Sequence, residues 1–412
     1  MKAHAIATLW KSADGRVRVA AAIPLGILAK RLPVARVKEV LREHGRASQR
    51  EREMPAHVVV YYVIALALYR EVSTREVLRY LQEGAKWLLE PATSLKVTGK
   101  SGISQARSRL GWQPLKTLHD EVVRPLAKAE TKGAWYRGWR LVTLDGSTLA
   151  VRDTQVNRAA FGKPAASRGE SGFPQVRFVS LVENGTHALF GTALGAYGEG
   201  ESSLAKAVVP QLGKGMLCLA DRNFFGFALW QQARKTGADL LWRVKKNLRL
   251  PVEQRLADGS YLSTLYATER DRRHRRHGVA VRVIEYELLE VLGAEPSYRL
   301  ITTLLDPEQS PAHELASLYP QRWEIETAFD ELKTHLRGGA QMVLRSKTPD
   351  LVRQEFWGFL LAHFAVRGIM HEAALSAGED PDRLSFTHTV RVIRRKLPQF
   401  AAFPPSALAG AS

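Results

Sequence analysis

The feature that most constrains the fold is a run of five apolar residues, Met216–Ala220, which stops abruptly at Asp221. A run this short and this apolar is typical of a strand buried on both faces, which requires helices on both sides of a sheet. A second run, Arg140–Leu144, stops in the same way at Asp145. The chain is therefore predicted to be an α/β protein with a mixed sheet flanked by helices.

Other segments fit this architecture. Further strands are expected at 176–182, 187–197 and 239–244, and helices at 202–212 and 225–236. The alternation of strands and helices is broken at residues 247–309. This segment contains a strongly basic stretch, Arg270–Arg276, and two strand-like runs at 279–289 and 298–305. We interpret them as a β-rich insertion. After Pro311 the pattern is helical and includes an apolar helix over 356–370.

The N-terminal part is predicted to be all helical. Ser73–Glu76 has the pattern of a capping box that opens a helix through Gln82, with Gly84 as its stop. Gly102–Leu110 is predicted to be a short basic helix with a serine N-cap. Such a helix is either the second helix of a helix-turn-helix that enters a major groove or an ordinary surface helix.

These patterns divide the chain into five parts. We predict a basic, helical, DNA-binding N-terminal domain (1–135), the first part of a catalytic core (136–246), the β-rich insertion (247–309), the second part of the core (310–372) and a C-terminal helical tail (373–412).

Charge indicates the partner. The chain has 60 Lys and Arg against 41 Asp and Glu, a net charge of +19. Such an excess of positive charge favours a polyanionic binding partner. Nucleic acid is the simplest candidate, and an anionic membrane surface is the alternative. Residues 1–50 carry 11 Lys or Arg against three acids. This segment is either an arm that contacts phosphates or a solvated tail.

Nothing in the sequence indicates a membrane or secreted protein. The longest apolar run, Val58–Tyr69, would reach only about 18 Å as a helix, too short for a bilayer core of about 30 Å. No secretion signal is recognisable, and a single cysteine, Cys218, excludes an internal disulfide. We expect a cytoplasmic, nucleoid-associated protein without a membrane partner.

Asp145 and Asp221 are candidate metal ligands because enzymes that cut phosphodiesters use carboxylates to hold divalent ions. Both follow apolar runs and precede turn-compatible residues, so both carboxylates are expected at a sheet edge. Aspartates at strand ends are also common turn formers, which is the alternative. A third such residue, Asp306, is followed by Pro307 and belongs to the insertion.

A polar helix face supplies a third carboxylate. At about 100° per residue, Tyr319, Arg322, Glu326 and Lys333 fall within an arc of about 60°, too narrow and too polar for a core stripe. Pro320 suits a first helical turn, so Tyr319 is expected as an N-cap. One carboxylate with two cations suits a metal ligand flanked by phosphate clamps. The alternative is a surface helix with an i,i+4 ion pair.

In this order, the four residues match the Tyr-x₂-Arg-x₃-Glu-x₆-Lys signature of the bacterial insertion-sequence DDE transposases of the "Y-R-E-K" group, the insertion-sequence-four family. The chain resembles this family from about 55 to 372. The supporting blocks are Leu144–Ser147, Leu219–Phe224 with Trp242–Lys245, and Leu344–Pro349 leading to Glu355.

The resemblance implies a ribonuclease H-like core in which Asp145, Asp221 and Glu326 are catalytic and bind two Mg²⁺, or Mn²⁺, ions. It also implies that Tyr319 and Arg322 grip the phosphate beside a flipped base and that Lys333 contacts the terminal transposon nucleotides. The 105 residues between Asp221 and Glu326 leave room for the insertion.

The implied reaction begins with hydrolysis at a terminal inverted repeat. The freed 3′-OH then attacks the opposite strand to form a hairpin, which is reopened before joining to target DNA. The partners would be transposon-end and target DNA, with a homodimer that pairs both ends. Trp230, Trp242 and Trp323 are candidates for stacking on the flipped base, with core packing as the alternative.

Two other functions fit the residues. One is a ribonuclease H-like nuclease or resolvase that hydrolyses DNA without joining it. The other is a catalytically inactive DNA-binding protein. A zinc enzyme is disfavoured because one cysteine and the pair His274 and His277 give no recognised zinc spacing.

Overall fold

A computed structural model describes residues 8–11, 17–20, 31–48, 54–85, 99–166, 169–170, 172–287, 297–336 and 343–399. Much of the basic arm predicted in residues 1–50, and the end of the chain from residue 400, lie outside these ranges.

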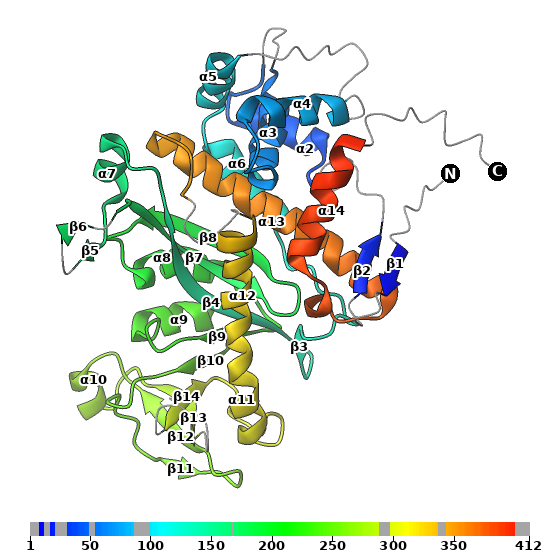
Figure 1. The fold of residues 1–412 in the computed structure, drawn as a ribbon. Coiled ribbons are helices and arrows are strands. Elements are labelled where there is room, and N and C mark those ends of the chain that lie inside the picture. The colour runs from blue at the N-terminus through cyan, green and yellow to red at the C-terminus, as the bar shows by residue number, and fades with distance from the viewer. Residues whose placement is uncertain are drawn as a thin grey trace.

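A ten-stranded mixed sheet forms the centre of the described structure (Figure 1). Its strand order is β11-β12-β13-β14-β10-β9-β4-β7-β8, with β3 paired to β4. The strands are β3 (Trp135–Tyr136), β4 (Trp139–Ala150), β7 (Gln175–Glu183), β8 (Ala188–Ala196), β9 (Met216–Ala220), β10 (Asp239–Arg243), β11 (Gln254–Arg255), β12 (Tyr261–Leu265), β13 (Val279–Tyr286) and β14 (Tyr298–Thr302). Two small hairpins lie apart from it, β1 (Thr8–Lys11) with β2 (Val17–Ala20), and β5 (Ala165–Ala166) with β6 (Gly169–Glu170).

Helices surround this sheet. Those of the N-terminal part are α2 (Val34–Glu43), α3 (Ala56–Leu68), α4 (Thr74–Ala85), α5 (Lys100–Leu110) and α6 (Gln113–Val122). Those between the strands are α7 (Gln155–Phe161), α8 (Glu201–Val208), η1 (Val209–Gln211), α9 (Phe227–Lys235) and α10 (Glu269–Arg273). The last part contains α11 (Ala312–Leu318), η2 (Tyr319–Trp323), α12 (Glu324–Asp330), η3 (Glu331–Leu336), α13 (Pro349–Ala377), η4 (Pro381–Arg383) and α14 (Phe386–Gln399).

Strand β9 is buried on both faces, as its composition predicts. Leu217 and Leu219 pack with α11, whereas Cys218 and Ala220 belong to the larger core on the opposite face. Because side chains alternate along a strand, a fully apolar sequence is needed to fill both layers. The prediction of a mixed sheet with helices is confirmed.

Helix α13 joins the sheet to the N-terminal helices. It is buried over most of its circumference and packs against α3 and α6 as well as against β8 (Figure 1). Helix α3, the longest apolar run in the sequence, is likewise buried almost throughout. A helix that is apolar all round belongs in a core. In the described part of the chain, no helix is both long enough and apolar enough to span a membrane.

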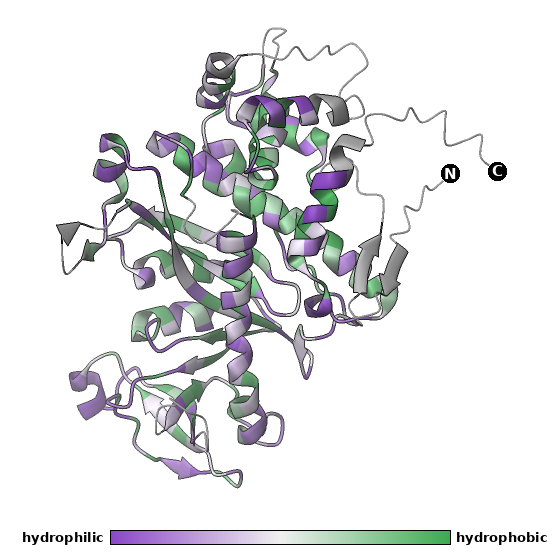
Figure 2. Ribbon diagram, in the orientation of Figure 1, coloured by the Kyte–Doolittle hydropathy of each residue, from purple (hydrophilic) through white to green (hydrophobic). Residues whose placement is uncertain are grey.

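Several details differ from the predictions. Strand β4 continues to Ala150, because residues 145–150 remain paired with β7 after the partner strand β9 has ended. Asp145 is therefore within a strand rather than at its end. The insertion is β-rich, but it extends the main sheet through the antiparallel pairing of β14 with β10. Its basic stretch begins as the short helix α10, which is hydrophilic in Figure 2.

The N-terminal part is mainly helical but not all helical, since β1 and β2 pair within it. The predicted helix start is confirmed, because the Ser73 hydroxyl accepts a hydrogen bond from the Glu76 amide. The predicted end is wrong, since α4 continues past Gln82 and Gly84 to Ala85. The serine N-cap is wrong: α5 begins at Lys100, and its N-cap is Gly99. The predicted boundary between residues 372 and 373 lies inside helix α13. The division of the chain into five parts stays a prediction.

Glu355 on α13 connects three parts of the fold. Its carboxylate accepts hydrogen bonds from the Arg345 amide at 3.0 Å and the Ser346 amide at 2.9 Å, and it forms an ion pair with Arg70. Burial alone would raise the pKa of Glu355, but Arg70 and Arg107 hold it below its ordinary value. The neighbouring Leu344 bridges to Val151 just beyond the end of β4.

Replacing Glu355 should therefore destabilise the protein. We expect Glu355→Ala to lower the free energy of unfolding by about 3–5 kcal/mol, because it leaves the buried Arg70 guanidinium without its carboxylate. Chemical denaturation would measure this. The control is Glu379→Gln, which removes an exposed pair with Arg383 and should cost about 0–1 kcal/mol. Equal effects of the two variants would contradict the role given to Glu355.

Candidate active site

The pairing of β4 with β9 brings two of the predicted carboxylates together. These strands are parallel, and Leu144 is the register partner of Ala220. The next residues along the two strands are Asp145 and Asp221, so they are neighbours across the pair. Side chains alternate along a strand, so both aspartates point to the face on which Leu217 and Leu219 pack with α11.

The helix that carries the third carboxylate crosses this face. Segments α11, η2, α12 and η3 follow one another without a break from Ala312 to Leu336, and form the long yellow helix of Figure 1. Two contacts attach η2 to the sheet. The Tyr319 hydroxyl donates to the Ala220 carbonyl at 3.3 Å, and the Asn184 side chain donates to the Gln321 carbonyl at 2.9 Å.

Tyr319 is not the N-cap that the sequence predicts. It lies inside the helical run, where the chain is wound as a 3₁₀ helix over Tyr319–Trp323. In a 3₁₀ helix, residues three apart are eclipsed, so Tyr319 and Arg322 lie one above the other. Tyr319 is 5% exposed, and burial raises the pKa of its phenol.

Two cations on this helix contact strand β4. Arg322 Nη1 donates to Asp145 Oδ2 at 3.0 Å, and Lys333 Nζ donates to Ser147 Oγ at 2.9 Å. Asp145 and Ser147 are two residues apart and share one face of β4. The helix face predicted from the sequence therefore lies against the strand face that carries Asp145.

Glu326 lies between these two contacts in the sequence. It is exposed on α12, one helical turn after Arg322, and α12 packs against β4. Among the described residues, the carboxylate oxygens of Asp145, Asp221 and Glu326 do not all lie within 4.8 Å of one another. Glu326 follows Arg322, which contacts Asp145, by one helical turn.

Asp145 has an unusual electrostatic environment. Burial raises its pKa to about 6, although the Gly146 amide and Arg322 oppose the shift, while the nearby Glu201 and Asp221 add to it. Even with Arg322 beside it, the Asp145 carboxylate has too little positive charge nearby to keep its pKa at the ordinary value. A divalent cation would supply that charge, and the carboxylate oxygens of Asp145 and Asp221 are the donors that Mg²⁺ and Mn²⁺ prefer. The residues present fit such ions.

Glu201, the first residue of α8, lies beside this group although no sequence pattern predicts it there. Its side chain approaches Gly146 so closely that a Cβ atom on Gly146 would lie 3.0 Å from Glu201 Oε1. A glycine beside the first aspartate therefore leaves space for a further acid. No motif marks Glu201, because a Glu in the first turn of a helix is common for reasons of helix stability alone.

Comparison with known proteins agrees with this geometry. Residues 138–365 match the family model "Transposase DDE domain", and residues 22–120 match "Insertion element 4 transposase N-terminal". The chain belongs to the insertion element 4 family of DDE transposases. The DDE domain implies a ribonuclease H-like fold, use of divalent metals and binding to DNA.

Individual relatives are also transposases. The chain is 28% identical to the transposase InsG for insertion sequence element IS4 of Escherichia coli K12, over 91% of this chain and 83% of that protein. It is 23% identical to the putative transposase InsZ of the same strain, over 52% of this chain and 70% of that protein. The putative transposase InsL for insertion sequence element IS186A, also from this strain, is 36% identical over 24% of each chain.

The three tryptophans considered for base stacking have different environments in the transposase. Trp230 and Trp242 are fully buried and form an edge-to-face pair, so they are core residues. Trp323 is 57% exposed, and the Arg322 guanidinium lies 5.1 Å from the centre of its ring. Among the three, Trp323 alone presents its ring at the surface next to the site.

Helix α5 contacts the rest of the transposase through one face. Ile103, Ala106 and Leu110 are buried, and Arg107 donates to the Gln354 side chain at 2.8 Å. Gln105, Ser108 and Arg109 are exposed. Arg107 thus holds α5 against α13, while the exposed residues leave open the prediction that α5 binds DNA.

Crowding at Gly146 should impair the transposase. We expect Gly146→Val to reduce cleavage of transposon ends by about 10²-fold, because the new side chain displaces Glu201 and shifts the strand that carries Asp145. A gel assay of cleavage, with the melting temperature as a check of folding, would measure this. Gly172→Val is the control, since a Cβ there meets no atom within 4 Å. Wild-type cleavage by Gly146→Val would show that this space is not needed.

Proposed function

We propose that this transposase moves its element by a cut-and-paste reaction in which Asp145, Asp221 and Glu326 hold two divalent cations, Mg²⁺ or Mn²⁺. The observation that carries the proposal is the contact between the helix and strand β4, where Arg322 meets Asp145 and Lys333 meets Ser147. These contacts lie on either side of Glu326 along the helix and support its assignment as the third ligand, because they set the helix against the strand that carries Asp145. The signature is that of the Y-R-E-K group, to which we assign the chain.

Divalent cations held there would stabilise the charge that develops on the attacking and leaving oxygens at phosphorus. Each proposed step is an in-line displacement, so one site serves all of them. The steps are hydrolysis at the terminal inverted repeat, attack of the 3′-OH on the opposite strand to form a hairpin, reopening of the hairpin, and joining to target DNA.

Arg322 has two roles in this proposal. Without DNA, its guanidinium forms an ion pair with Asp145 at 3.0 Å. With divalent cations held by Asp145, Arg322 would be free to bind a phosphate of the transposon end, for which a planar guanidinium is well suited. Lys333 contacts the terminal nucleotides. Tyr319 contacts the phosphate beside the flipped base after its hydrogen bond to the Ala220 carbonyl opens, and Trp323 is the proposed stacking platform.

The proposal also includes a homodimer that pairs two transposon ends. Transposases of this mechanism need both ends before joining, and the C-terminal helices are the proposed contact surface. Sedimentation of the protein with and without end DNA would test the dimer separately from cleavage.

Glu326→Gln should abolish end cleavage, by at least about 10³-fold, while end binding persists, because the exchange removes a cation ligand and leaves the phosphate contacts in place. Cleavage, hairpin and joined products would be separated on gels after incubation with Mg²⁺, end DNA and a target plasmid. The control, Glu308→Gln, changes an exposed glutamate of the turn before α11 and should behave as wild type.

Two results would contradict the proposal in different ways. Cleavage by Glu326→Gln at the wild-type rate would show that the site assignment is wrong. Cleavage by the wild-type protein without joined product would favour a nuclease or resolvase.

End binding should weaken steeply with salt, since phosphate contacts release counterions, with a slope of about −0.9 per contact in a log–log plot. Arg322→Ala should reduce that slope by about one if its guanidinium binds a phosphate. Fluorescence anisotropy at several salt concentrations would measure both slopes. An unchanged slope would mean that Arg322 stays on Asp145 when DNA binds.

A further inference from the structure

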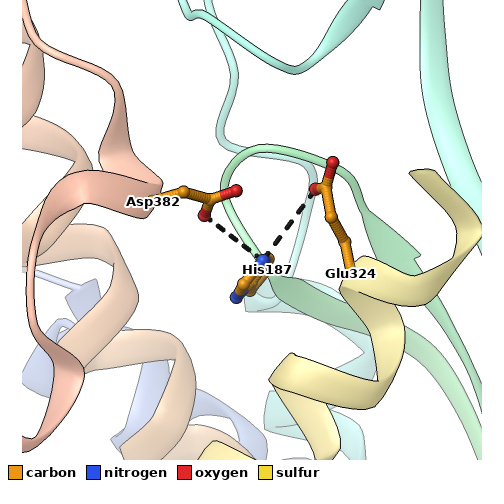
Figure 3. A group of neighbouring side chains, drawn as sticks. All are labelled: His187, Glu324 and Asp382. Atoms are coloured by element: carbon orange, nitrogen blue, oxygen red, sulfur yellow. Dashed lines mark ion pairs between the residues drawn. The ribbon is translucent and has the colours of Figure 1, made fainter. Parts of the chain in front are cut away.

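Three side chains with donor atoms suited to a metal ion lie on the other side of the helix that carries Glu326. His187, Glu324 and Asp382 each offer one ligand atom, and these three atoms lie within 4.8 Å of one another (Figure 3). His187 lies in the turn between β7 and β8, Glu324 begins α12, and Asp382 lies in η4. In Figure 3 the two carboxylates approach the His187 ring from opposite sides.

The spacing is that of ligands around one small cation. His187 Nε2 lies 3.2 Å from Asp382 Oδ1 and 3.9 Å from Glu324 Oε2. Tetrahedral zinc with bonds of about 2.1 Å places its ligand atoms about 3.4 Å apart. The backbone amide of Gly185 donates to Glu324 Oε2 at 2.5 Å, which fixes this carboxylate toward the histidine.

His187 provides an independent sign of a ligand. The residue is 2% exposed, and its Nε2 atom is shielded from solvent and makes no well-directed hydrogen bond, its nearest acceptor being Asp382 Oδ1 at 3.2 Å. Burying a ring nitrogen without a well-directed hydrogen bond is costly. Its other nitrogen, Nδ1, lies 3.4 Å from Glu331 Oε1 and also contacts Arg367. Because a guanidinium only donates, the contact with Arg367 makes Nδ1 an acceptor and puts the ring proton on Nε2. A cation bound at Nε2 would displace that proton, and Nδ1, once its contact with Arg367 opens, would carry a proton directed at Glu331, as in metal sites whose histidine is oriented by a carboxylate.

The charges around the group also favour a cation. Glu324, Glu331 and Asp382 supply three carboxylates, and Arg367 supplies one guanidinium, which binds Glu331. If all three acids are ionised, two negative charges remain, and a divalent cation would balance them. The side chains line a cavity of about 400 Å³, which gives an ion and water access.

We propose that His187, Glu324 and Asp382 form a structural site for a borderline divalent transition-metal cation, Zn²⁺ in the first instance. One imidazole and two carboxylates favour Zn²⁺ over Mg²⁺, which prefers an all-oxygen shell. The ion ties the C-terminal segment to the β7–β8 turn and to the first residue of α12. The site is separate from the proposed catalytic ions, because Glu324 and Glu326 lie on different faces of the helix.

Zinc binding to the full-length protein tests the site. The Asp221→Asn variant serves as background, because it weakens the catalytic carboxylate pair. After chelator treatment and reloading, we expect one tightly bound Zn²⁺ per chain by elemental analysis, and a melting temperature that rises with Zn²⁺ but not with equal Mg²⁺. Adding Asp382→Asn should remove that ion, with at least tenfold weaker binding by calorimetry, and should abolish the melting shift.

Controls make the result specific. Glu379→Gln, in the same segment but paired with Arg383, should keep the ion. Asp382→Asn removes one of two mutually repelling carboxylates, so its metal-free form should fold; Glu324→Gln provides a second variant with the same expected loss. Binding of Zn²⁺ that is unchanged in both variants, or no tighter than binding of Mg²⁺, would overturn the proposal. Because the test compares variants in one background, it does not depend on the assignment of the catalytic ions.

Discussion

The parallel register between β4 and β9 is the constraint on which the active site depends. Leu144 pairs with Ala220, so the chain delivers Asp145 and Asp221 to one face at one level. A shift of one residue would turn one of these aspartates toward the opposite layer, because side chains alternate along a strand. The apolar residues of β9 fix the register: Leu217 and Leu219 fill one layer, while Cys218 and Ala220 fill the other.

The helix that runs from Ala312 to Leu336 is the second fixed element, and two of its faces make different contacts. One face carries Arg322 and Lys333, which contact strand β4. The other carries Glu331 and also Glu324, which lies about 160° around α12 from Glu326 at about 100° per residue. The first face meets β4, and the second meets His187 and the buried Arg367 of α13. Helix α13 is itself packed on the N-terminal helices. The orientation of Glu326 is therefore coupled to parts of the chain that are remote in sequence.

Local composition was sufficient to predict a strand whose residues are buried along nearly its whole length. Met216–Ala220 has the predicted bounds because every residue in it is buried apart from the first. The end of β4 could not be predicted, since residues 145–150 resemble a turn and become a strand only through β7, which is distant in sequence. The four-residue helix face was predicted from spacing alone, but the winding of η2 as a 3₁₀ helix, which buries Tyr319, was not.

The acids that sequence reasoning missed share one property. Glu201 and Asp382 each lie in the first turn of a short helical segment, a position where an acid is expected for helix stability alone. Each acid also has a contact that only tertiary packing creates: Glu201 lies against Gly146, and Asp382 lies against His187. In a single sequence, an acid at the start of a helix therefore says little about function. The structure says more, because it shows which buried groups the acid contacts. In this transposase Glu201 lies against the glycine that follows Asp145, and Asp382 lies against the histidine that faces Glu324 on the helix of Glu326, and these contacts distinguish both acids from ordinary residues of a first helical turn.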